Sequence, residues 1–133
     1  MVKYTWATLD QWVLKTKRRT DAVLKDATQT TIAIAQKTKA KDGRMPVITN
    51  NLRDSLESSI AGGVKGDGEE SYILVAGNMK GGDLATFVWT AEYAAAVNNG
   101  NRGRPGAHFV EGAVDQWTAI VRASTAKAKA RVR

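Results

Sequence analysis

The sequence contains no cysteine, a single histidine and only two prolines in 133 residues. Without cysteine the chain has no disulfides, no thiolate metal ligands and no thiol nucleophile, which fits a reducing compartment. Residues 1–6 lack the apolar run of a signal peptide, and no window approaches the roughly eighteen apolar residues of a membrane-spanning helix. We therefore expect about one ordinary domain with no membrane partner.

Sites for chemistry are also scarce. His108 has no serine, carboxylate or ligand pattern around it at the spacing of a triad or a metal site, which leaves it a packing or hydrogen-bonding role. The acidic cluster Asp67, Glu69 and Glu70 lacks the spacing and the closing glutamate of a calcium loop. None of the glycine pairs carries the Gly-Lys-Ser/Thr ending of a phosphate loop. We expect no enzymatic activity, no metal and no cofactor.

The net charge of +7 is distributed unevenly along the chain. Residues 1–40 carry eight basic and three acidic side chains, residues 41–100 carry five and eight, and residues 101–133 carry seven and two. Basic charge at both chain ends can attract nucleic acid or an acidic partner. Solvated lysines on helix faces are the simpler interpretation.

Residues 9–40 have the strongest periodic pattern, which predicts one long amphipathic helix. Thr8 and Gln11 have the spacing of a capping box at its start, and Pro46 limits its end. An unbroken helix of this length would be about 48 Å long, against a radius of gyration of about 14 Å for a compact chain of this size. We expect a kink at the weak helix formers Thr28–Thr31, or packing against a neighbouring molecule. The predicted stripe consists of Leu9, Val13, Thr16, Thr20, Val23, Ala27, Thr30 and Ile34.

The middle of the chain predicts a small antiparallel sheet. After Pro46, Thr49 or Asn50 can cap a short helix that carries Leu52 and Leu56. Three short apolar segments separated by glycine-rich turns then favour an antiparallel meander with one face packed on helices. The strands are expected at residues 58–64, 72–77 and 84–90, with turns at residues 65–68 and 78–82.

The last third predicts two further helices. Residues 92–98 form a helical turn that ends at Gly100, and residues 107–123 form a second long helix. The apolar face of that helix is expected to contain Phe109, Ala113, Val114, Trp117, Ile120 and Val121. Beyond Arg122 the apolar stripe gives way to basic residues. We therefore expect a single α+β domain over residues 1–125, with long N-terminal and C-terminal helices packed on the small sheet, and a basic tail at residues 126–133.

Two motifs have competing interpretations. Arg102-Gly103-Arg104-Pro105 matches the core of an AT-hook, whose arginines lie in a narrow A·T minor groove. We favour a surface loop in which glycines supply unusual backbone angles and the arginines are available to a protein partner. Trp12 and Trp117 lie on predicted stripes and are expected in the core, whereas Trp6 precedes the long helix and is a candidate interface anchor.

Three segments, taken in order, resemble the minor tail and tail-completion proteins of long-tailed bacteriophages. They are Pro46-Val47 with Asn51-Leu52-Arg53-x-Ser55-Leu56, then Tyr93-Ala94-x-x-Val97-x-x-Gly100, and then Phe109-Val110 at the start of an amphipathic helix. Together they span residues 44 to about 117, slightly over half of the chain. The usual residues of that family are replaced by Ile48, Asn50, Asn98 and His108.

The resemblance implies a structural virion protein at the head-proximal end of a tail, made in the host cytoplasm, which completes the tail or joins it to the head. Its partners would be further copies in a ring, typically hexameric, with neighbouring neck, connector, tail-tube or tail-terminator proteins and nonspecific contact with DNA. The alternative is a small basic DNA-binding protein that uses the AT-hook-like loop. Candidate interface residues are Trp6, Arg53, Asn99, Arg102, Arg104 and His108, and candidate contacts with DNA or an acidic partner are Lys127, Lys129, Arg131 and Arg133.

Overall fold

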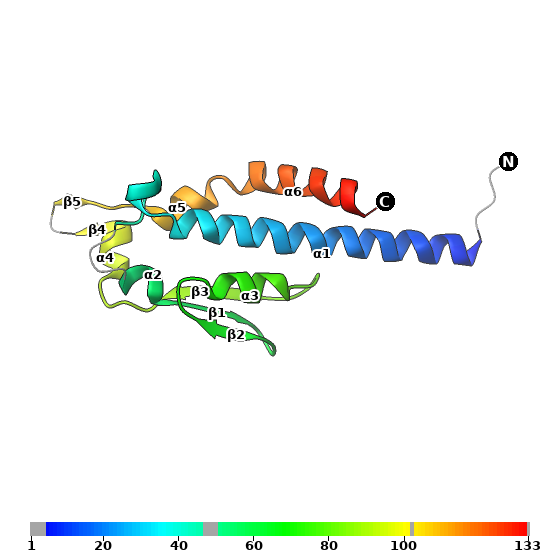
Figure 1. Cartoon of the computed structure of the whole chain (residues 1–133), viewed down its shortest axis with the longest axis horizontal. Helices are drawn as coiled ribbons and strands as arrows, with labels where there is room; N and C mark the ends of the chain where they lie inside the picture. Colours follow the sequence, from blue (N-terminus) through cyan, green and yellow to red (C-terminus); the bar gives the residue numbers. More distant parts are fainter. Residues whose placement is uncertain (1–4, 47–50, 102, 133) are drawn as a thin grey trace.

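The computed structural model describes residues 5–46, 51–101 and 103–132, and it is dominated by one helix, α1 (Trp6–Gln36) (Figure 1). With 31 residues this helix is about 46 Å long. It runs without a break through the threonine-rich centre, where Thr31 Oγ1 donates a 2.8 Å hydrogen bond to the carbonyl oxygen of Ala27. The kink that we considered is therefore absent from α1. Such bonding back to the preceding turn satisfies the hydroxyl of a buried threonine.

The predicted start of α1 is wrong by one turn. Thr5 is the N-cap residue, and its side chain accepts a 3.2 Å hydrogen bond from the backbone nitrogen of Thr8. Thr8 is therefore already helical and cannot cap. A capping threonine needs extended backbone, and Thr5 has φ −98° and ψ 161°. The helix also ends at Gln36 rather than near residue 40, because residues 39–41 form a separate 3-10 turn, η1 (Lys39–Lys41).

The predicted second long helix is two helices, α5 (Phe109–Val114) and α6 (Trp117–Arg131), separated at Asp115 and Gln116. Both pack on α1, and α6 runs antiparallel to it, so the C-terminus of the chain lies partway along α1 (Figure 1). The buried face of α6 does not end at Arg122, because Ser124 and Ala128 are buried as well. Small residues thus continue the helix contact where no apolar stripe is visible in the sequence.

A three-stranded antiparallel sheet lies on the opposite side of α1 from α6 (Figure 1). Its strands are β1 (Leu56–Ile60), β2 (Lys65–Asp67) and β3 (Ala85–Trp89), in the order β2-β1-β3. The expected meander is wrong, because β1 is the central strand and a helix separates β2 from β3. Lys65–Asp67 forms the short edge strand β2 where a turn was expected.

The segment that separates β2 from β3 is α3 (Ser71–Gly77), where residues 72–77 were expected to form a strand. Burial of Ser71, Val75 and Ala76, with Ile73 and Leu74 exposed, follows a helical period. An apolar run of six residues fits either a buried strand or a helix, so its periodicity does not decide between them. α3 packs on both α1 and the sheet and lies between them.

The remaining elements form the end of the molecule that lies at the C-terminus of α1. They are α2 (Asn51–Asp54), α4 (Ala94–Asn99), β4 (Gly100–Asn101) and β5 (Arg104–Pro105). Leu52 is buried on α2, but Leu56 belongs to β1 rather than to the same helix. The predicted caps Thr49 and Asn50 lie outside the described residues. The helical turn that ends at Gly100 is confirmed as α4.

Two buried clusters hold these layers together. One joins α1, α2, α4 and α5 and includes Ala35, Leu52, Ala94 and Phe109. The other lies between α3 and the sheet and includes Ile60, Val75 and Met79. The α+β class with a long N-terminal helix, a C-terminal helix and a small antiparallel sheet is confirmed. Among the described residues, no helix has the length and apolar content required to cross a membrane.

Candidate assembly surfaces

The first candidate surface is the β4–β5 hairpin with the segment that leads into α5. Residues 107–110 are joined to α4 by three backbone-nitrogen hydrogen bonds: Ala107 N to Val97 O (2.8 Å), His108 N to Asn98 O (3.0 Å) and Val110 N to the side-chain oxygen of Asn98 (3.1 Å). Asn98 is buried although it is polar, and its side-chain oxygen is satisfied by the backbone nitrogen of Val110. The hairpin is therefore attached to the core at its base.

Glycine is required at the base of this hairpin. Gly100 has φ +92°, and a Cβ atom there would lie 2.7 Å from the carbonyl oxygen of Arg104. A Cβ atom on Gly106 would overlap the carbonyl oxygen of Asn98. Neither position has room for a side chain, and the left-handed backbone at Gly100 favours glycine in any case.

A carboxylate and the single histidine lie beside the hairpin. The amide nitrogen of Asn98 donates to both carboxylate oxygens of Glu111, at 2.9 and 3.0 Å. These bonds lower the pKa of Glu111, and His108, whose Nδ1 lies 3.4 Å from Glu111 Oε2, adds to the effect. His108 precedes α5 with left-handed φ of 50°, and its side chain is half exposed. It has the hydrogen-bonding role expected from the sequence.

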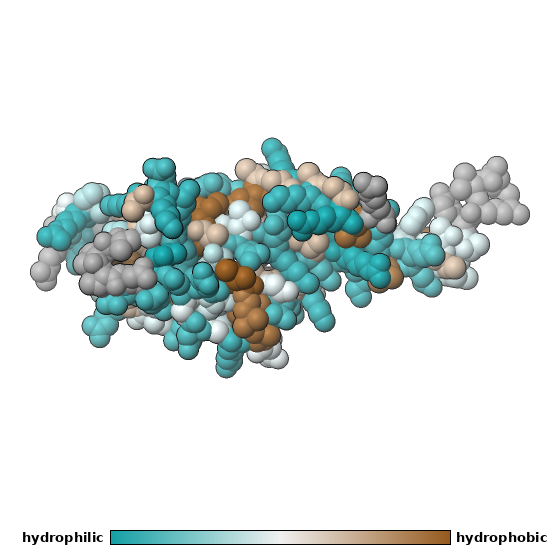
Figure 2. Space-filling model, in the orientation of Figure 1, coloured by the Kyte–Doolittle hydropathy of each residue, from teal (hydrophilic) through white to brown (hydrophobic). Residues whose placement is uncertain are grey.

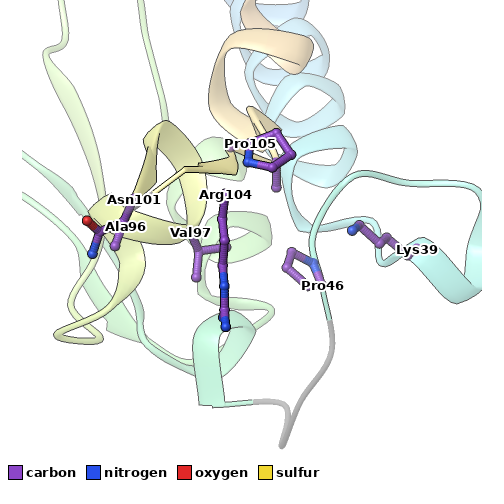
Figure 3. A pocket seen from close by; sticks show the side chains of 9 residues that line it. Lys39, Pro46, Ala96, Val97, Asn101, Arg104 and Pro105 are labelled. Atoms are coloured by element: carbon purple, nitrogen blue, oxygen red, sulfur yellow. The ribbon is translucent and has the colours of Figure 1, made fainter.

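An open groove of about 760 Å³ runs under the hairpin. Arg104 extends from β5 between Val97 and Pro46, and Lys39 lies on the far side of Pro46 (Figure 3). Asn101 pairs with Arg104 across the hairpin, so the second arginine of the AT-hook match lies in a β-ladder. A hook in the minor groove would need extended backbone, and this pairing would have to open. Arg102 lies outside the described residues.

Arg53, another candidate interface residue, makes its contacts inside the molecule. Its Nε donates to the carbonyl oxygen of Gln36 at 2.9 Å, and its Nη1 lies 3.1 Å from Glu69 Oε2. Gln36 is almost fully buried, and its amide nitrogen donates to the carbonyl oxygens of Arg53 and Glu69, both at 3.0 Å. The sequence gives no signal for Gln36, because a glutamine near a helix end is ordinarily solvated.

The second candidate surface is the N-terminal part of α1, at the opposite end of the molecule from the hairpin (Figure 1). Trp6 is 82% exposed there, as expected for an interface anchor, and Val13 is 60% exposed. Trp12 and Trp117, which were expected in the core, are 50% and 41% exposed, so that expectation is wrong. Trp12 lies two turns before Arg19, beside which α6 ends, and Trp117 is the first residue of α6.

The basic C-terminal residues lie on the last turns of α6 rather than on a separate extended segment. Lys127, Lys129 and Arg131 are exposed, and Lys127 Nζ lies 3.7 Å from Asp26 Oδ2 of α1. Arg133 lies outside the described residues. Because α6 is antiparallel to α1, these residues lie near the basic residues in the first half of α1. The two basic ends of the sequence thus meet in space.

The structure therefore separates the candidate residues into groups. Asn99, Arg104 and His108 gather at the hairpin end, Trp6 lies at the far end of α1, and the α6 lysines lie between them. No group of three or more potential metal-ligating side chains occurs among the described residues. Comparison with known proteins found no matching family model, no matching curated protein and no matching solved structure.

Proposed function

We propose that this protein is a structural virion subunit at the head-proximal end of a phage tail, where it completes the tail or joins it to the head. The resemblance over residues 44–117 supports this assignment. Two of its segments have clear structural roles. The segment that ends at Gly100 forms α4 and the start of the hairpin, and Phe109 is buried between α1 and α4. The subunit would act in the virion after synthesis in the host cytoplasm.

One observation carries the proposal. The molecule is elongated along α1 and presents unlike exposed surfaces at its two ends, the N-terminal turns of α1 and the β4–β5 hairpin (Figure 1). A contact between two unlike surfaces of neighbouring copies is heterologous, or head to tail, and a series of such contacts forms a ring when the rotation between copies closes. A ring of identical subunits, typically hexameric in the family that the sequence resembles, would have the neck, connector, tail-tube and tail-terminator proteins as neighbours.

Cryo-electron microscopy of particles tests this proposal. We expect density for several symmetry-related copies at the head-proximal end of the tail, and genes for portal, capsid and tail-tube proteins beside the gene for this chain. A single copy per particle, or a location away from the tail and neck, would contradict the proposal. Native mass spectrometry of the purified protein provides a second measurement of ring formation.

The meeting of the two basic chain ends favours contact with nucleic acid as a second candidate function. α6 carries four basic residues and no acidic residue, and its C-terminal end reaches the basic first half of α1, where Arg19 donates a hydrogen bond to the carbonyl oxygen of Val132. We expect binding to free duplex DNA to be weak, independent of sequence and steeply reduced by salt, as counterion release requires. Sequence-specific nanomolar binding to A·T-rich duplex would instead support the alternative in which the Arg102–Arg104 loop acts as a hook.

A further inference from the structure

The N-terminal part of α1 extends beyond the elements that pack on this helix. On one side α6 ends beside Arg19, whose Nε donates a 2.8 Å hydrogen bond to the carbonyl oxygen of Val132. On the other side the turn after α3 reaches α1 at Asp21, whose Oδ1 accepts a 2.8 Å hydrogen bond from the backbone nitrogen of Gly81. The thirteen residues Trp6–Arg18 precede both of these contacts, over about 20 Å, and Val132 borders a groove with Trp12, Lys15 and Arg18 at the C-terminal end of this segment. We call these residues the α1 extension.

The apolar stripe of α1 continues along this extension. Thr16, Thr20 and Val23 line a groove of about 420 Å³ against α6. The same alternating spacing of three and four residues continues toward the N-terminus through Val13, Leu9 and Trp6, which are 60%, 36% and 82% exposed. An apolar stripe at this spacing ordinarily packs against another helix or a groove between helices. The extension thus has the apolar spacing of a helix contact, while Trp6, Leu9 and Val13 are exposed.

The extension is also basic. Residues 6–19 carry four basic side chains and one acidic side chain. The sheet and α3, residues 56–89, have the opposite balance, with five acidic and two basic side chains. Opposite charge on two exposed surfaces steers their association and disfavours pairing of either surface with itself.

The acidic unit also has an exposed apolar surface. Ile73 and Leu74 on α3 are 42% and 55% exposed, and Leu84 in the turn before β3 is 68% exposed. Figure 2 shows hydrophobic side chains gathered over α3 and the sheet. Beside them lies an open groove of about 410 Å³ between α1 and α3, with Ala33, Ile34, Tyr72 and Ile73 in its lining. Lys37 borders the groove, and the exposed Glu70 immediately precedes α3.

We propose that the α1 extension of one copy docks on the α1–α3 groove of the next copy, with Trp6, Leu9 and Val13 against Ile73 and Leu74. This inference rests on the proposed function, and it assigns the head-to-tail contact to the α1 extension and this groove rather than to the β4–β5 hairpin. The basic residues Lys15, Lys17 and Arg18 then face the acidic unit that contains Glu70. Two extensions paired with each other would instead bring their basic residues together, which costs energy.

The absence of cysteine makes a disulfide test direct. Val13→Cys and Leu74→Cys are made in separate full-length chains, mixed in equal amounts and exposed to a mild oxidant. The matched control replaces Leu74→Cys with Val114→Cys, which is equally exposed at 55% but lies on α5, away from the groove. We expect a crosslinked 13–74 dimer in several-fold greater yield than the 13–114 control. The yield should fall when Trp6→Ala is added. It should also fall as salt is added, because the Debye screening length decreases from about 10 Å at 0.1 M to about 3 Å at 1 M.

Three results would overturn the docking proposal. The first is a dominant 13–13 product, which means that two extensions pair with each other. The second is equal yields of the 13–74 and 13–114 products, and the third is no crosslinked product at all. None of these results contradicts the proposed function, which depends on the position of the chain in particles. Copies found at the head-proximal end of the tail without a 13–74 crosslink would reject the docking contact alone.

Discussion

The indole nitrogen of Trp89 on β3 donates a 2.8 Å hydrogen bond to the side-chain oxygen of Gln36, the last residue of α1. The same glutamine donates to backbone carbonyl oxygens of Arg53 and Glu69, so one buried side chain joins α1 to α2, to the segment before α3, and to the sheet. This arrangement fixes the position of the sheet relative to α1. It thereby sets the shape of the α1–α3 groove.

Gln36→Ala should destabilise the fold more than the loss of the side chain's methylene and amide groups alone suggests. It leaves the Trp89 N–H and two carbonyl groups without their partner, and each buried polar group left unsatisfied costs about 1–3 kcal/mol. Urea unfolding measures the loss, with Gln29→Ala on the same helix as the control. Equal midpoints for the two variants would show that the Gln36 bonds contribute nothing to stability.

Substitution of Phe109 and substitution of Arg102 with Arg104 should separate the effects on folding from those on head–tail joining. Phe109 is 2% exposed and makes an edge-to-face contact with Trp89, with ring centroids 5.2 Å apart. Its loss should reduce the free energy of unfolding by about 3–5 kcal/mol. Arg102→Ala combined with Arg104→Ala should leave thermal stability nearly unchanged and reduce the joining of heads to tails, because exposed loops contribute little to the core. A stability loss in the arginine variant as large as that in Phe109→Ala would refute this separation.

Gly106→Ala should disrupt the base of the hairpin. Its Cβ atom would overlap the carbonyl oxygen of Asn98, and forced overpacking costs about 1–3 kcal/mol. Gly77→Ala is the matched control, because no atom lies within 4 Å of a Cβ at that position. It should be neutral or stabilising by up to about 1 kcal/mol. Thermal unfolding of the two variants measures the difference, and a Gly106→Ala protein as stable as Gly77→Ala would contradict the geometry of the hairpin.

The pH dependence of stability should include a contribution from Glu111. The hydrogen bonds from Asn98, with His108 beside the carboxylate, lower the pKa of Glu111 below its ordinary value of 4.5. A lowered pKa in the folded state stabilises the fold above the ordinary value, and this contribution is lost as the pH falls through the lower folded value. Glu111→Gln should therefore lose less stability than the native chain between about pH 5.5 and pH 3. Identical curves for Glu111→Gln and the native chain would reject the effect.

The sequence predicts the elements that have a periodic pattern over many residues or a glycine at a boundary. The length of α1, strand β3 and the α4 turn before Gly100 all follow from local patterns. The strand expected at residues 72–77 fails because a six-residue apolar run has no decisive period, and only contact with α1 and the sheet makes it α3. The exposure of Trp12 also could not be predicted from the sequence, because the burial of this part of α1 depends on where α6 ends.

The candidate surfaces are predictable only in part. Trp6 and the hairpin could be proposed from their position and composition, whereas Gln36 and Asn98 act through tertiary hydrogen bonds that no spacing reveals. The meeting of the two basic chain ends likewise depends on the antiparallel packing of α1 and α6. Arg53 resembles a surface residue in the sequence but binds Gln36 and Glu69 in the structure. Charge along the chain therefore predicts the presence of a basic surface but not its location.

Electron microscopy of lysates from a phage that lacks this chain tests the proposed function most directly. A protein that completes the tail or joins it to the head acts after heads and tails have been built separately. We therefore expect DNA-filled heads, unattached or abnormal tails and few infectious particles, with joining restored when the native chain is supplied. Normal joined virions in the absence of the chain, or heads that fail to package DNA, would contradict the assignment to the head–tail junction.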